Sequence, residues 1–243
     1  MPGRKPTGRA SAAEAPASLT AIYSAALKLF SEKGFDGASV GALNRELGVS
    51  HNLMHRRFGS KEALWHSTVD WAFGQLADEL RAEDELSAPD VLVAVHAMVV
   101  RFLEVHARHP EILRLVAVEG AAPGPRLTYL YEAHIAPLHA RLTAPLNPLV
   151  DRGLLREVDV RSLHFLIAHG ATAPFSLVPF ARMLHPMDPL DPKAVRAHAE
   201  FVADMVVAGL QARGAGKGDP TAEYSSSATT TRLRRAARAE DRA

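Results

Sequence analysis

The sequence predicts an all-α protein of about nine helices, and three observations support this prediction. Apolar residues recur with a period near 3.6 in almost every segment, as at Leu92, Val95 and Val99. No segment alternates apolar and polar residues with the period of two that is typical of strands. Of the 243 residues, 47% are hydrophobic and 23% are charged, which is enough apolar material for a sizeable globular core.

The first helices can be placed by their capping and breaking residues. A stripe of apolar residues from Leu19 onward predicts a first helix that ends near Gly34. A second helix over 39–47 and a third over 50–57 each begin at a serine, a preferred N-cap residue. Ser60 begins a longer fourth helix.

Further boundaries follow from Pro, Gly and capping residues in the remainder of the chain. They fall near Ser87, at His109–Pro110, at Pro123 to Pro125, at Gly153, near Asp159, and across Pro186 to Pro192. The last two predicted helices cover 159–182 and 191–212. The first of them is apolar nearly all round, which suits a helix covered by core on one side and by a partner on the other. Pro174 is expected to kink it.

Charge, cysteine content and hydropathy exclude several classes of protein. The 28 Lys and Arg against 27 Asp and Glu give a net charge of +1, so nucleic-acid binding would depend on a local patch. The absence of cysteine excludes disulfides and thiolate chemistry. No apolar run approaches the ~20 residues of a membrane-spanning helix, and no secretory signal is evident. We therefore expect a cytoplasmic protein without a membrane partner.

The short helices over 39–47 and 50–57 have the spacing of a helix-turn-helix, in which the second helix enters the major groove of DNA. On its outward face Asn52 can pair with adenine, Arg56 with guanine or phosphate, and Leu53 can contact a thymine methyl. The predicted DNA-contacting residues are Ser39, Ser50, His51, Asn52, Leu53, His55, Arg56, Arg57 and Lys61. From spacing alone, a helical hairpin with a solvated polar face is an equal alternative.

A resemblance favours the DNA-binding interpretation. The stretch GFDGASVGALNRELGVSHNLMHRRFGSKEAL, residues 34–64, resembles the DNA-binding domain of the TetR/AcrR family of bacterial transcriptional regulators. The matching motifs are Gly34-Phe35 after the first helix, Gly48-Val49-Ser50 in the turn, and the run 58–64 that opens the fourth helix. Two motifs depart from the family pattern, because Leu43-Asn44 replaces Ile-Ala and residues 52–55 replace Gly-Thr-Leu-Tyr.

The resemblance implies a domain organisation and a function. It implies a helix-turn-helix DNA-binding domain over 18–75 and a helical ligand-binding and dimerisation domain over 76–213, between a disordered basic arm (1–17) and a disordered tail (214–243). The chain would be a ligand-responsive repressor that binds a palindromic DNA operator as a homodimer through 159–182 and 191–212. The alternative is a helical small-molecule-binding protein or enzyme that shares the fold without operator binding.

Twelve histidines raise the question of a metal or ligand site. His134 and His139 are five residues apart, as are His164 and His169, so each pair should point in different directions around an α-helix and chelate poorly. We predict no metal, no cofactor and no catalytic residues. His134, His169 and Phe102 are the candidates for contact with a small-molecule effector. On the last two helices, Phe175 and Val206 are the expected dimer contacts.

Overall fold

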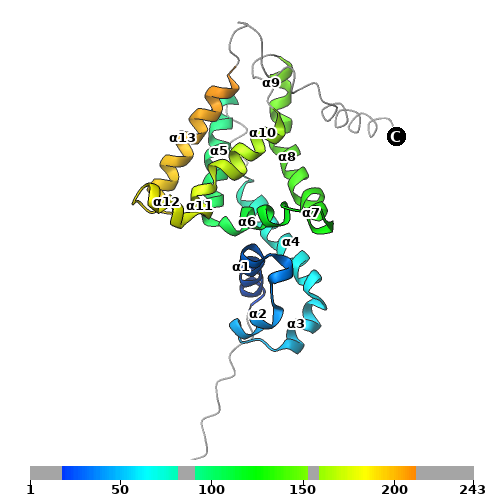
Figure 1. Ribbon diagram of the computed structural model, residues 1–243. Coiled ribbons are helices and arrows are strands. Elements are labelled where there is room, and N and C mark those ends of the chain that lie inside the picture. Colours follow the sequence, from blue (N-terminus) through cyan, green and yellow to red (C-terminus); the bar gives the residue numbers. More distant parts are fainter. Residues whose placement is uncertain (1–17, 82–90, 153–158, 212–243) are drawn as a thin grey trace, which may run out of the picture.

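The computed structural model describes residues 18–81, 91–152 and 159–211, and the elements assigned in these ranges are helical. The predicted basic arm and tail lie outside the described residues. Figure 1 shows a smaller N-terminal group of helices below a larger C-terminal group. The all-α prediction is thus confirmed for the part of the chain that the structure describes.

Four helices form the N-terminal group: α1 (Leu19–Gly37), α2 (Val40–Glu46), α3 (His51–Phe58) and α4 (Lys61–Glu79). At the start of each, a serine hydroxyl oxygen accepts a hydrogen bond from the backbone N–H three residues on, at 3.0–3.2 Å. These serines are Ser18, Ser39, Ser50 and Ser60. The predicted starts of the second, third and fourth helices are therefore confirmed. Gly48, with φ of 64°, provides the left-handed turn between α2 and α3.

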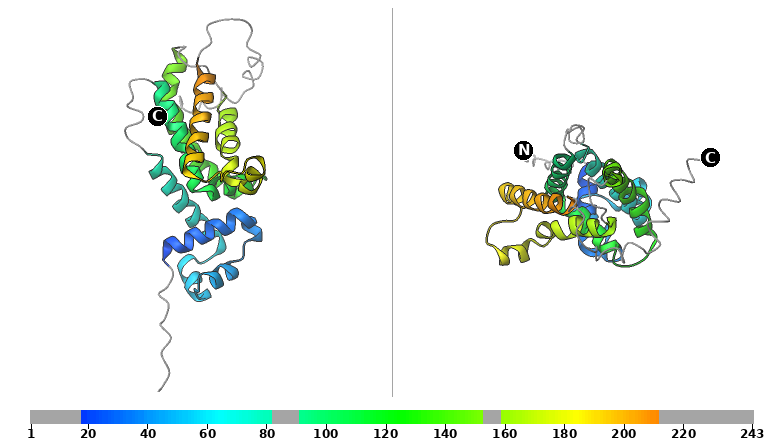
Figure 2. Two further views of the ribbon diagram at one scale, coloured as in Figure 1. Left: turned by 90° about the vertical axis from the view of Figure 1, so that its left-hand side faces the viewer. Right: turned by 90° about the horizontal axis from the view of Figure 1, so that it is seen from above.

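The C-terminal group contains α5 (Val91–Arg108), α6 (Pro110–Glu119), α7 (Pro125–Tyr129), α8 (Ala136–Thr143), α9 (Asn147–Asp151), α10 (Val160–His164), α11 (Ala173–Ser176), α12 (Val178–Leu184) and α13 (Pro192–Leu210). A π-helical turn over Leu130–Ile135 joins α7 to α8, and a 3₁₀ turn over Ala144–Leu146 joins α8 to α9. The helices α5 and α13 pack side by side (Figure 2). None of the described helices has the length and apolar character needed to cross a membrane.

Two hydrophobic clusters hold these helices together. The first contains the buried apolar side chains of α1 to α4, including Phe30 and Trp65, and extends to Val105 of α5 and Leu115 of α6. The second joins α5 and α13 and includes Phe175. The first cluster thus crosses the predicted domain boundary between residues 75 and 76, so α4 and α6 share one core.

The predicted helix over 159–182 is not continuous. After α10, a π-helical turn over Phe165–Ala171 leads into α11, and the chain breaks at Leu177 before α12. Pro174 lies in the first turn of α11, where a missing N–H leaves no hydrogen bond unmade. The prediction that Pro174 kinks a continuous helix is therefore wrong, because a new helix begins at this position.

The predicted dimer contacts Phe175 and Val206 lie inside the protomer. Both are buried in the second cluster, which joins α5 and α13 and includes Phe175. The large apolar side chains most exposed on α13 are Phe201 and Met205, which are 62% and 60% exposed. Periodicity identified the apolar helices but not which of two apolar faces turns inward.

The prediction that His164 and His169 point apart is also wrong. Their ring centroids lie 5.4 Å apart, because the intervening turn is π-helical. A π-helix closes its hydrogen bonds between residues five apart, which brings side chains at this spacing onto one face.

Burial of His106 makes the stability of the protein depend on pH. The ring is 1% exposed and bonds through Nδ1 to the carbonyl oxygen of Phe102 at 2.7 Å. Desolvation lowers the pKa of His106 to about 4 from 6.5. Between these values the unfolded chain binds a proton that the folded chain excludes.

We therefore predict that His106 makes the free energy of unfolding depend on pH only below pH 6.5. Its titration should lower this free energy by about 3 kcal/mol as the pH decreases from 6.5 toward 4. Urea unfolding at a series of pH values measures this dependence. In a His106→Asn variant, whose side-chain amide nitrogen occupies the position of Nδ1 and can still donate to Phe102, the slope should decrease by about one proton. Equal slopes in the two proteins would contradict the assignment.

Candidate DNA-binding site and interdomain contacts

The helix α3 is anchored by one face and presents the other to solvent. Met54 is 3% exposed and packs in the first cluster, while His51, Asn52, His55, Arg56 and Arg57 are exposed. Leu53 is half-buried against the first cluster, so less of it faces outward than its position in the predicted face implies. The helix therefore offers a polar, basic surface on a fixed support.

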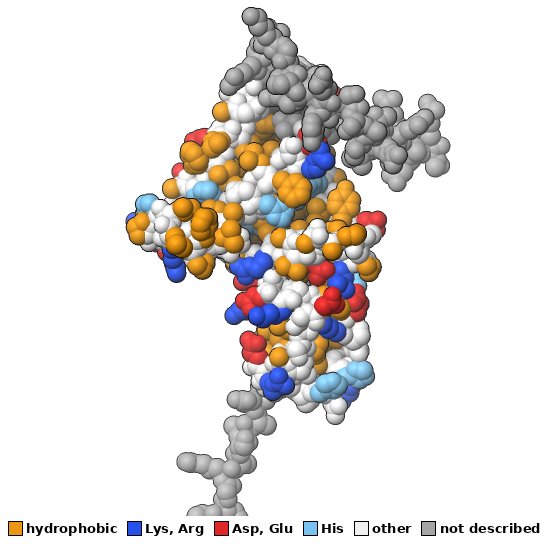
Figure 3. Space-filling model, in the orientation of Figure 1, with side chains coloured by type: hydrophobic (Ala, Val, Ile, Leu, Met, Phe, Trp, Pro, Cys, Tyr) orange, Lys and Arg blue, Asp and Glu red, His pale blue; other side chains and the backbone are white. Residues whose placement is uncertain are grey.

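The remaining predicted contacts surround this helix. The Ser39 and Ser50 hydroxyl oxygens accept the capping hydrogen bonds of α2 and α3, which leaves each O–H free to donate outward. A shallow hollow beside α3 is lined by Val40, His51, Met54, His55, Phe58, Gly59, Ser60, Lys61 and Leu64. In Figure 3, histidine side chains mark this lower end of the molecule.

The Lys61 side chain lies against the end of α1. Its Nζ lies 4.5 Å from the centroid of the Phe35 ring and 3.4 Å from the carbonyl oxygen of Asp36. It thereby ties the start of α4 to the end of α1. A phosphate contact by Lys61 would require this side chain to leave Phe35.

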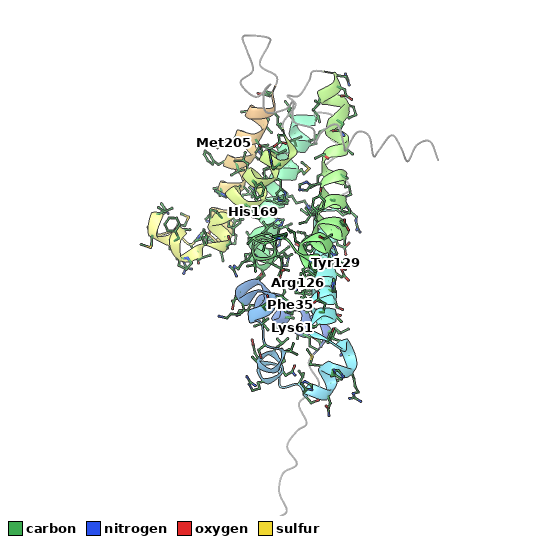
Figure 4. The ribbon with its side chains drawn as sticks, turned by 45° about the vertical axis from the view of Figure 1, so that its right-hand side comes forward. Phe35, Lys61, Arg126, Tyr129, His169 and Met205 are labelled. Carbon is green, nitrogen blue, oxygen red and sulfur yellow. The ribbon has the colours of Figure 1, made fainter. Side chains whose placement is uncertain are left out.

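A cationic side chain of the C-terminal group also packs on the Phe35 ring. The guanidinium carbon of Arg126, on α7, lies 4.0 Å from the centroid of the same ring. Arg126 Nε donates to Glu119 Oε2 at 3.0 Å, and a second nitrogen lies 3.9 Å from Glu62 of α4. Phe35, Lys61 and Arg126 thus meet where the two groups of helices join (Figure 4).

A second set of contacts ties α7 and the following turn to α4. The Tyr129 hydroxyl donates to Asp70 Oδ1, and His134 Nε2 lies 3.0 Å from the same oxygen. Burial and then the hydrogen bond to Asp70 raise the pKa of Tyr129 to about 12, so the hydroxyl keeps its proton. Burial lowers the pKa of His134, and Asp70 opposes this shift.

Of the three predicted effector contacts, His134 lies in different surroundings from Phe102 and His169. His134 lies at the junction with α4, with its ring 4.8 Å from that of Phe73. Phe102 packs on the ring of His106, and His169 lies beside His164 on the π-helical turn. Within the described residues, no three His, Asp or Glu side chains are placed to hold a metal ion. Sequence reasoning missed Arg126 and Asp70, whose partners are distant in the chain.

Comparison with known proteins identifies the family. Residues 22–68 match the model of bacterial regulatory proteins of the tetR family, and residues 92–206 match a tetracyclin repressor-like C-terminal domain. The HTH-type transcriptional regulator RutR of Escherichia coli is 32% identical over 163 residues, which span 67% of this chain and 76% of that protein. The chain belongs to the TetR family. The matched ranges cover both the helix-turn-helix and the helices of the C-terminal group.

The chain is also similar in sequence to a further regulator and in structure to two regulators whose structures are known. The HTH-type transcriptional repressor NicS of Pseudomonas putida is 24% identical over 200 residues, 78% of this chain and 91% of that protein. The structure of PfmR from Thermus thermophilus aligns with a TM-score of 0.53 at 23% identity, over 83% of this chain and all of that one. The structure of FadR from Bacillus subtilis in complex with stearoyl-CoA aligns with a TM-score of 0.57 at 17% identity. The alignment covers 77% of this chain and 97% of that one. These two structural likenesses show the fold.

One departure from the TetR family pattern has a structural cost. Asn44 on α2 is 6% exposed, and its Oδ1 is buried without a hydrogen-bond partner. An unpaired buried carbonyl group loses its hydration without compensation. Alanine, the usual residue of the family at this position, avoids that loss.

We therefore predict that Asn44→Ala raises the free energy of unfolding by about 1 kcal/mol. Urea denaturation of the variant and the parent protein measures the change. Ser50→Ala, which removes the N-cap of α3, provides a contrasting control and should lower stability by about 1 kcal/mol. A loss of stability in Asn44→Ala would show that the amide has a partner that compensates for its burial.

Proposed function

We propose that this TetR family regulator is a homodimeric repressor that reads a palindromic operator with α3 and releases it when a small molecule binds the C-terminal group of helices. The exposed basic face of α3 carries this proposal. Asn52, His55 and Arg56 project from a helix whose opposite side is fixed by Met54. A regulator of this kind acts on chromosomal DNA, and we place it in the cytoplasm.

The chemistry of this face suits base-edge and phosphate contacts. Asn52 can donate to and accept from one adenine, and Arg56 can donate twice to one guanine. Arg57, near the end of α3, suits a phosphate. Two copies of α3 related by a two-fold axis would enter successive major grooves ~34 Å apart, which makes the operator palindromic.

The exposed apolar side chains of the C-terminal group support a dimer. Phe201 and Met205 of α13 and Phe165 and Leu166 beside α10 are each more than half exposed. Figure 4 shows Met205 projecting outward from α13. Exposed apolar area of this extent is typical of a protein–protein interface. We therefore propose that α10, the turn after it, and α13 form the interface.

Arg126 and Tyr129 provide a path for the ligand response. Both come from α7 and contact the N-terminal group, Arg126 at Phe35 and Tyr129 at Asp70 of α4. A ligand that moves the turn after α7 would change these contacts and the position of α4. Because α3 is joined directly to α4, the separation of the two recognition helices would change as well. The ligand would then favour a dimer that fits the operator poorly.

We predict that an Asn52→Ala, His55→Ala double variant loses sequence discrimination and about 1–3 kcal/mol of operator binding. Arg57→Ala should weaken binding to all duplexes. It should also reduce the slope of the logarithm of the binding constant against the logarithm of the salt concentration by about one. Operators for this assay are selected from genomic fragments by the purified protein. Arg152→Ala removes an exposed cation from the far end of the molecule and is the matched control. Unchanged affinity in the folded double variant would refute this placement of the DNA contacts.

We predict that Phe201→Glu and Met205→Glu each convert a dimer into monomers, because each would bury an unpaired charge at the interface. Sedimentation velocity at micromolar concentration measures the association state. Tyr131→Glu, at another exposed large side chain, should remain dimeric. A monomeric parent protein would contradict the proposed dimer.

A further inference from the structure

Four histidines from different elements gather in the C-terminal group, and we call them the histidine cluster: His106 of α5, His139 of α8, His164 of α10 and His169 of the following π-helical turn. His139 Nε2 and His164 Nδ1 are 2.7 Å apart. The rings of His164 and His169 lie 5.4 Å apart, and His169 is near enough to His106 to contribute to the lowering of its pKa. The cluster lies apart from His134, which is bound to Asp70.

Two phenylalanines lie against the histidine cluster. The Phe102 ring is 4.0 Å from that of His106, and the Phe165 ring is 5.3 Å from that of His169. Figure 3 shows histidine side chains among hydrophobic ones on the upper half of the molecule, and Figure 4 places His169 above the junction of the two helical groups. These rings supply flat apolar faces on which another aromatic ring can pack.

The hydrogen bonds within the cluster determine what it can offer to a ligand. In the His139–His164 pair one ring donates and the other accepts, so a neutral pair retains one further donor and one further acceptor. A neutral His106 donates from Nδ1 to Phe102, and because its ring is only 1% exposed it supports Phe102 rather than offering a nitrogen to a ligand. The cluster therefore presents acceptors as well as donors, without a net charge.

The surroundings keep the four rings neutral. Burial lowers the pKa of each, and together with the neighbouring histidines it lowers the pKa of His106 and His164 to about 4. His109 also lowers the pKa of His106, while Glu79 raises it. Glu79 is itself held by Arg108 and His109, each at 2.7 Å. An anionic or cationic ligand would thus find no compensating charge on the cluster.

We propose that the histidine cluster, with Phe102, binds the effector, and that this effector is an uncharged aromatic compound that donates hydrogen bonds through hydroxyl or ring N–H groups. The ring of such a compound packs on the aromatic side chains, and its donor meets an imidazole lone pair. The effector role of this site rests on the proposed function, whereas binding of the compound to the site does not require DNA binding.

Phenol, toluene and benzoate test the proposal, because they have similar size and differ in donor and charge. The full chain with ¹³C-labelled histidine is titrated with each compound, and the imidazole signals are followed by NMR. Phenol should shift the signals of the histidine cluster and bind roughly tenfold more tightly than toluene, as one or two hydrogen bonds would give. Benzoate should bind more weakly than phenol.

Variants locate the site. His169→Phe keeps a ring of similar size but removes both nitrogens, and should reduce phenol affinity severalfold, whereas His185→Phe at an exposed position should not. An unchanged phenol affinity in folded His169→Phe, benzoate binding as tight as phenol, or unshifted cluster signals would overturn the proposal.

A DNA-release assay separates this inference from the proposed function. Saturating phenol should weaken binding to a selected operator fragment. Phenol binding at the cluster with unchanged operator affinity would overturn the effector role. A protein that binds phenol but no duplex would refute the proposed operator binding and leave the binding site standing.

Discussion

The first hydrophobic cluster is the interaction on which the rest of the structure depends. Trp65 of α4 is fully buried among side chains from α1, and the same cluster continues through Leu115 of α6. Met54 attaches α3 to this core. Because one continuous core holds both groups of helices, the position of α3 cannot be changed without a change in the packing of α4. The part proposed to contact DNA and the part proposed to bind a ligand are thus mechanically joined.

Polar contacts join the two groups of helices at positions where a displacement of α7 would change them. Arg126 is held by Glu119 and packs over Phe35, and Asp70 receives hydrogen bonds from Tyr129 and faces His134. These contacts depend on direction more strongly than apolar packing does, so a small displacement of α7 changes them before the core is disrupted. Such a junction can have two arrangements of similar free energy, which is what a regulator requires.

The π-helical turns distinguish the C-terminal group from a simple helical bundle. The turn over Phe165–Ala171 aligns His164 with His169, and that over Leu130–Ile135 places His134 against Asp70. A wider helical turn widens the backbone locally and changes which side chains share a face. The turn over Phe165–Ala171 therefore brings together two histidines that a regular α-helix with the same sequence would direct apart.

The sequence by itself determined the helical class, the serine N-caps and the helix-turn-helix, because these depend on residues a few positions apart. It also determined which residues of α3 reach solvent, apart from the partial burial of Leu53. Only the tertiary structure decided that Phe175 faces inward while Phe201 faces outward, since both lie in apolar stretches and the choice depends on where α5 packs. The same holds for Arg126 on Phe35 and for the four histidines, whose contacts join residues that are far apart in the chain. Periodicity records local geometry, and contacts between distant segments are fixed only when the helices pack.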